Sequence, residues 1–119
     1  MDFSWLQGNS NCGGGLMTSA FKYAKENDIE SEKHYVYQER EGFCKYDPSK
    51  TKISGFINIP KGDEEAHQNA IASVGPISVA IDCTNTLLRY DSGILNDRTC
   101  DSYSLNHGVW LYDMETKTA

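Results

Sequence analysis

The sequence contains no apolar run that approaches the roughly 20 residues needed to span a bilayer as a helix. It also lacks a cluster of basic residues, and 17 acidic residues outnumber 11 basic ones. We therefore expect neither nucleic acid nor a membrane surface as a partner. The N-terminal MDFSWLQGN has neither the positive start nor the apolar core of a signal peptide, so the sequence read literally predicts a cytosolic chain.

Close cysteine pairs are absent as well. None of the four cysteines lies in a Cys-x-x-Cys motif, and the three histidines are not spaced to complete a zinc site. We therefore expect no metal ion and no other cofactor. Widely spaced cysteines among glycine-rich loops are typical of the disulfide framework of an exported protein, and four buried free thiols are the alternative. The cysteines are Cys12, Cys44, Cys83 and Cys100, and the histidines are His34, His67 and His107.

Length and composition favour one globular domain. The 119 residues suffice for one ordinary domain and are too few for two. Hydrophobic residues make up 39% of the chain and charged residues 24%, which are values of folded proteins. Helical patterns come first and strand patterns later, so we expect an α+β fold. The expected elements are helices at 16–27 and 64–73, strands at 52–60, 77–82 and 108–112, and loops at 1–15 and 29–52.

Local signals set the bounds of these elements. Apolar residues at helical spacing begin the first helix at Leu16. Asp63 can cap the second helix, which Gly75 and Pro76 would end. Residues 77–82 alternate apolar and polar side chains, a pattern typical of a half-buried strand.

His107 is a candidate general base, because it enters an apolar strand between Asn106 and Gly108. A histidine in such a place is more often structural, and a base needs a nucleophile and an orienting group nearby. Ser104 and Cys100 are local candidates for the nucleophile, but neither lies in a turn that obviously exposes it. The residues alone therefore indicate a base without a clear nucleophile.

Two further clusters have simple structural explanations. The carboxylates of residues 63–65 stand at a helix start, where they interact favourably with the helix dipole. The glycines at 13–15 could cradle a phosphate, but no strand precedes them and the lysine and hydroxyl residue of a P-loop do not follow. Neither cluster predicts a site by itself.

Five stretches of the sequence form a recognisable series. They are QGNSNCGGGLMTSAFKYAKEN, GFINIPKGDEE, SVGPISVAID, YDSGI and SLNHGVWL. In order and spacing they resemble the papain family of cysteine proteases, in its cathepsin L-like form, over residues 1–112. The resemblance implies a partial papain-like fold within one domain, 1–119. Residues 1–50 would be the tail of the helical lobe, and residues 51–119 an incomplete β-barrel lobe.

The resemblance also implies a site. His107 matches the catalytic base, which pairs with a thiolate and then protonates the leaving amine. Gly14 and Gly15 match a loop of the cleft, where the lack of a side chain lets the substrate backbone approach. The other matched substrate-binding positions are Met17, Ala80, Leu105 and Asn106, the first three in the hydrophobic pocket for the side chain two residues before the cut.

Several family features have no match in these residues. Cys12, Cys44 and Cys100 match structural cysteines, but Phe3 stands where the partner of Cys44 is usual. The partners of the other two would lie outside the sequence, and Cys83 has no counterpart. The Cys-Gly-Ser-Cys-Trp motif of the nucleophile and the Asn-Ser-Trp-Gly motif of the orienting asparagine are both missing. We therefore expect mostly free thiols, marginal stability and no activity of the 119 residues alone.

Two functions fit the resemblance. The first is a cysteine endopeptidase with a Cys-His-Asn mechanism, which acts on peptides or proteins and needs a protein partner that supplies the missing lobe. The family implies a lysosomal or extracellular location. The alternative is a non-catalytic homologue that binds peptides or a protease.

Overall fold

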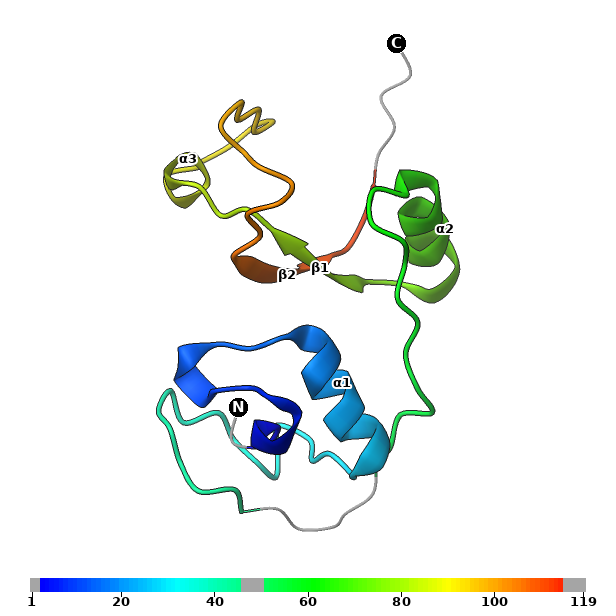
Figure 1. The fold of residues 1–119 in the computed structure, drawn as a ribbon, viewed down its shortest axis with the longest axis vertical. Helices are drawn as coiled ribbons and strands as arrows, with labels where there is room; N and C mark the ends of the chain where they lie inside the picture. The colour runs from blue at the N-terminus through cyan, green and yellow to red at the C-terminus, as the bar shows by residue number, and fades with distance from the viewer. Residues whose placement is uncertain (1–2, 46–50, 115–119) are drawn as a thin grey trace. The chain divides into compact units, whose positions relative to one another are not determined.

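The computed structural model describes residues 3–45 and 51–114. The chain forms two compact units, Met1–Asn58 and Ile59–Ala119 (Figure 1). Three α-helices and a two-stranded sheet lie among the described residues, which confirms the expected α+β class. The helices are α1 at Met17–Glu26, α2 at Glu64–Val74 and α3 at Asn85–Leu88, and the strands are β1 at Ile77–Ile81 and β2 at His107–Leu111. No helix of the described residues is long and apolar enough to cross a bilayer.

Helix α1 is the main element of the first unit and confirms the predicted helix to within one residue at each end. Its packed face contains Ala24, which is 7% exposed, and Phe21, whose ring stacks on Phe56 with centroids 5.6 Å apart. Two residues of the predicted apolar stripe, Leu16 and Ala20, are exposed instead. The helix therefore buries a narrower face than its sequence pattern indicates.

An aromatic cluster joins α1 to the segments before and after it. The Phe3 ring lies 5.7 Å from that of Tyr23 on α1 and 4.7 Å from that of Tyr35. The Tyr35 hydroxyl donates a hydrogen bond to the Phe43 carbonyl and accepts one from the Lys45 amide, both at 3.4 Å. Side-chain packing and these two bonds thus tie the start of the chain to residues near position 44.

The predicted strand at 52–60 is wrong. This segment pairs with no strand among the described residues, and the one bridge at its edge joins Ile29 to Thr51. The Ile53 amide instead donates to the Ala24 carbonyl at the end of α1, over 3.4 Å. A strand needs a neighbour to accept and donate its ladder of hydrogen bonds, and an apolar sequence alone does not supply one.

The sheet of the second unit is a pair of antiparallel strands. Val79 pairs with Val109, and Ile81 at the end of β1 pairs with His107 at the start of β2. Both predicted strands are confirmed within one residue at each end. Figure 1 shows the two strands crossing the second unit side by side.

Helix α2 begins as its sequence predicts. The Asp63 carboxylate accepts a hydrogen bond from the Ala66 amide at 2.9 Å, and Glu64 and Glu65 occupy the first turn. The helix ends at Val74, one residue later than expected, before Gly75. A cap of this kind satisfies an amide that the helix itself leaves free, which explains why the start was predictable.

The sequence did not predict the short helices. Helix α3 begins at Asn85 and is capped by Thr84, whose hydroxyl oxygen accepts a hydrogen bond from the Leu87 amide at 3.3 Å. Two 3-10 turns, Trp5–Gln7 and Asn11–Gly13, lie in the segment expected to be loop. Elements of three or four residues are too short to show a hydrophobic period. The rest of the predicted loop at 29–52 is irregular where it is described, and positions 46–50 lie outside the described residues.

Candidate active site

His107 is the first residue of β2 and its side chain is exposed. It stands opposite Ile81 in the sheet register. The preceding amide, that of Asn106, donates to the Ile81 carbonyl at 3.0 Å, so the backbone is held immediately before the histidine. The imidazole is therefore carried by a paired strand and is open to a reacting group.

The side chain of Asn106 anchors the same point of the chain. Its Oδ1 accepts a hydrogen bond from the Cys83 amide at 2.7 Å, and its Nδ2 donates to Asp82 Oδ1 at 3.1 Å. The other oxygen of Asp82 accepts the Asp101 amide at 2.9 Å. The end of β1 is thus connected to the residues that lead into β2.

Asp101 organises the turn before Leu105. Its carboxylate accepts bonds from the Tyr103 amide at 2.9 Å and from the Ser104 hydroxyl at 2.7 Å. The bond from the Tyr103 amide, which has the largest effect, and the bond from Ser104 hold the pKa of the Asp101 carboxyl below its usual value. Leu105, one of the predicted pocket residues, follows with 45% of its surface exposed.

Asp97 performs a similar role further back in the same connection. Its carboxylate accepts bonds from the Thr84 hydroxyl at 2.5 Å, the Thr99 hydroxyl at 2.7 Å and the Thr99 amide at 2.9 Å. Donation from Thr84, followed by that from Thr99, places the pKa of the Asp97 carboxyl far below its ordinary value. The long connection from β1 to β2 is therefore fastened at several points by ionised aspartates.

Gly14 and Gly15 require glycine for two different reasons. Gly14 has φ +97° and ψ −173°, a backbone conformation that essentially only glycine adopts, and nothing lies within 4 Å of the place of a Cβ. A Cβ on Gly15 would instead collide with the side-chain oxygen of Asn9. That oxygen accepts the Leu16 amide at 2.8 Å, and the Asn9 Nδ2 donates to the Ser4 hydroxyl at 2.8 Å. The space around the Cβ position of Gly14 is open.

The predicted site residues are divided between the two units. Within the second unit, Ala80 pairs with Gly108, next to His107, and its side chain is exposed. Met17 is half-buried at the first position of α1. The roles of these residues in substrate binding stay predictions. The first unit contains Gly14, Gly15 and Met17, and the second contains Ala80, Leu105, Asn106 and His107.

All four cysteines are free in the structure, and none is buried. Cys12, Cys44 and Cys100 are exposed, and Cys83 is half-buried. The structural roles that the resemblance implies for the first three stay predictions. Among the described residues, no group of three or more histidine, cysteine or acidic side chains is arranged to hold a metal ion.

Sequence reasoning missed the aspartates that support the candidate base. Asp97 and Asp101 each bond to a backbone amide two residues further on, the geometry of an Asx-turn. The sequence patterns Asp-x-Thr and Asp-x-Tyr-Ser are local features that could have predicted these turns. No local signal pointed to Asp82, because its partners lie 19 and 24 residues away.

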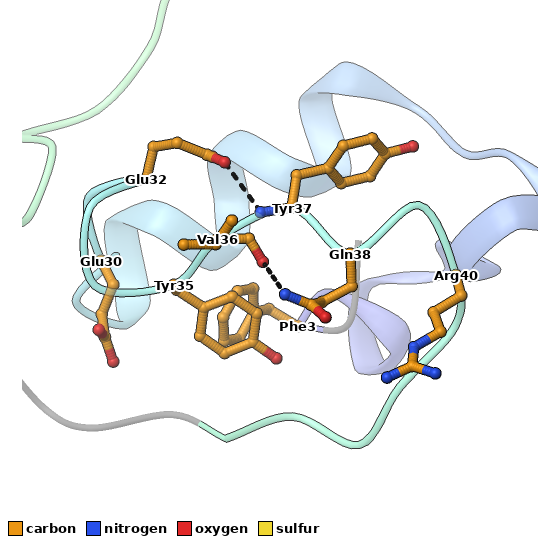
Figure 2. A pocket seen from close by; sticks show the side chains of 8 residues that line it. All are labelled: Phe3, Glu30, Glu32, Tyr35, Val36, Tyr37, Gln38 and Arg40. Atoms are coloured by element: carbon orange, nitrogen blue, oxygen red, sulfur yellow. Dashed lines mark hydrogen bonds between the residues drawn. The ribbon is translucent and has the colours of Figure 1, made fainter.

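A separate hollow of about 200 Å³ lies in the first unit (Figure 2). Its wall includes a Tyr37 amide that donates to the Glu32 carboxylate at 2.8 Å, drawn as a dashed line in Figure 2. It contains none of the predicted site residues and is smaller than ordinary ligand pockets of about 300–1,000 Å³. Its lining residues are Phe3, Glu30, Glu32, Tyr35, Val36, Tyr37, Gln38 and Arg40.

Comparison with known proteins identifies a family for this chain. The family described as papain family cysteine protease matches residues 2–118. Procathepsin L of Mus musculus is 45% identical over 115 residues, which are 93% of this chain and 34% of that protein. Cathepsin L1 of Drosophila melanogaster is 41% identical over 120 residues, which are 98% of this chain and 32% of that protein. The chain thus spans about a third of the length of these relatives.

Solved structures show the same likeness. The digestive procathepsin L 3 of the Tenebrio molitor larval midgut superposes with a TM-score of 0.89 at 41% identity, over 93% of this chain and 37% of that one. This likeness confirms the expected partial papain-like fold. Since the family matches nearly the whole sequence, the chain belongs to the papain family of cysteine proteases.

Proposed function

We propose that the chain supplies the catalytic base and part of the substrate-binding surface of a cathepsin L-like cysteine endopeptidase. The observation that carries the proposal is the placement of His107, exposed at the start of a paired strand and anchored through Asn106. Family membership supports a thiol as the reaction partner of this imidazole. The substrates would be peptides or proteins.

In the proposed reaction, His107 takes the proton of a cysteine thiol, and the thiolate attacks the carbonyl carbon of the scissile peptide bond. The resulting imidazolium gives its proton to the amine as the carbon–nitrogen bond breaks. Water then hydrolyses the acyl-enzyme and restores the thiol. We assign the nucleophile to a cysteine beyond these residues, because Cys12, Cys44 and Cys100 match structural positions of the family and Cys83 matches no position of the family.

The same proposal extends to specificity and location. Met17, Ala80 and Leu105 would line a hydrophobic pocket for the substrate side chain two residues before the cut. The open backbone at Gly14 would pair with the substrate main chain, as in strand addition. A lysosomal or extracellular compartment would suit this activity, and a protein segment that carries the nucleophile would be its necessary partner.

A fluorogenic peptide with an apolar residue two positions before the cut tests the proposal. We expect no turnover by the 119-residue chain, and turnover once it is co-expressed with a segment that carries a Cys-Gly-Ser-Cys-Trp motif. His107→Ala in the co-expressed protein should abolish that turnover. Turnover by the 119 residues alone that His107→Ala removes would place the nucleophile within them. An inactive co-expressed protein that still binds the peptide would favour a non-catalytic homologue.

A further inference from the structure

The carboxylate of Asp82 holds both ends of the segment that leads into His107. One of its oxygens accepts the side-chain amide of Asn106 at 3.1 Å, and the other accepts the backbone amide of Asp101 at 2.9 Å. Asp82 itself directly follows β1 and is half-buried. The side chain of Asp82, just after β1, thus bonds to two points of the segment that leads into β2.

The bond to Asp82 orients the side-chain amide of Asn106 together with a bond from the Cys83 amide. With Nδ2 directed to Asp82, Oδ1 is directed to the Cys83 amide, which it accepts at 2.7 Å. The backbone amide of Asn106 is engaged as well, with the Ile81 carbonyl at 3.0 Å. All three bonds converge on the residue immediately before His107. Without the carboxylate, the side-chain nitrogen of Asn106 loses its acceptor, and only the bond from the Cys83 amide to Oδ1 remains to orient the side chain.

The bond to Asp101 extends this support back along the chain. Asp101 in turn accepts bonds from Tyr103 and Ser104, so residues 101–104 form one hydrogen-bonded turn. The ammonium of Lys61 lies 4.1 Å from the centroid of the Tyr103 ring, which adds a cation–π contact to the same turn. The segment before His107 is therefore fixed at its beginning and at its end, and Asp82 is common to both.

We propose that Asp82 is a positioning residue for His107, which acts through the side chain of Asn106 and the backbone of Asp101. This inference rests on the proposed role of His107 as the base. Asp82 itself would touch neither substrate nor the reacting atoms. Its effect would be on the rate of the chemical step, because small displacements of a catalytic group reduce reaction rates far more than they reduce substrate binding.

The first test uses NMR on the 119-residue chain and needs no activity. In Asp82→Ala, we expect the side-chain amide protons of Asn106 to lose protection from exchange and the His107 ring resonances to shift. The amides of Val79 and Val109, at the centre of the sheet, should keep their protection. Asp82→Asn keeps one acceptor oxygen and should show an intermediate effect. The matched control is Asp91→Asn, an exposed aspartate outside these bonds, which should change neither signal.

The second test measures kinetics in the protein co-expressed with the segment that supplies the nucleophile. Asp82→Ala should lower kcat on the order of 10²-fold with little change in KM, and Asp82→Asn should recover part of the loss. Asp91→Asn should match the parent protein.

The two tests separate failure of the inference from failure of the proposed function. An unchanged Asn106 side-chain amide in Asp82→Ala would overturn the inference, as would a loss of kcat accompanied by loss of protection at Val79 and Val109. If the co-expressed parent protein has no activity, the proposed function fails. The NMR result alone then decides whether Asp82 positions the segment before His107.

Discussion

His107 and Ile81 face one another at the last pair of the β1–β2 ladder, where the Ile81 carbonyl also accepts the amide of Asn106. The backbone next to the imidazole is therefore held on one side by β1 and on the other by the hydrogen bond from Asn106 to Asp82. Because the ladder has only five residue pairs, its last pair lies close to the end of all regular structure. The hydrogen bonds that Asp82 accepts from Asn106 and Asp101 therefore hold the backbone next to the candidate base.

Gly15→Ala should destabilise the first unit by about 1–3 kcal/mol, because the new Cβ would collide with the side chain of Asn9. Chemical unfolding monitored by circular dichroism measures this change. Gly55→Ala is the matched control, since nothing lies within 4 Å of its Cβ position. Equal stability of the two variants would contradict the packing of Asn9 on Gly15.

Phe3→Ala should lower the free energy of unfolding by about 1–3 kcal/mol, through loss of its stacking with Tyr23 and Tyr35. The near-ultraviolet signal of the tyrosines should weaken in parallel. Phe43→Ala is the control, because that side chain is 87% exposed and only its carbonyl meets Tyr35. A Phe3→Ala variant as stable as the control would show that the cluster contributes nothing.

The connection between β1 and β2 should loosen in acid. The pKa of Asp97 is lower in the folded chain than its ordinary value of 3.8, so its contribution to stability is complete above about that pH and is lost as pH falls toward the folded pKa. The Thr99 amide resonance should report this titration, with its midpoint below 3.8. Asp97→Asn should remove the transition. A midpoint at or above the ordinary value would rule out the hydrogen bonds from Thr84 and Thr99.

The thiols should react as four free groups. Titration of the unfolded chain without reductant should count four thiols, and in the folded chain Cys12, Cys44 and Cys100 should be alkylated faster than the half-buried Cys83. Mass spectrometry after alkylation identifies each site. Two clean intramolecular disulfides would contradict this prediction and would indicate a framework particular to this chain.

Local features of the structure were predictable from the sequence. Helices α1 and α2 and the Asp63 cap depend on residues that are at most four positions apart in the sequence, so a local pattern predicts them. The segment 52–60 has the composition of a strand, but pairing depends on a distant neighbour, and no local pattern reports whether one is present. The bonds of Asp82 escaped prediction for the same reason, whereas His107 was found through its strand and its family motif.

The most direct test measures how fast iodoacetamide alkylates the second cysteine of the Cys-Gly-Ser-Cys-Trp motif in a co-expressed segment, at about pH 5. A thiolate paired with the imidazolium of His107 stays reactive in acid, whereas an isolated thiol is protonated. We predict that alkylation is on the order of 10²-fold faster with His107 intact than in His107→Ala. Equal rates in the two proteins would contradict the claim that this chain supplies the catalytic base.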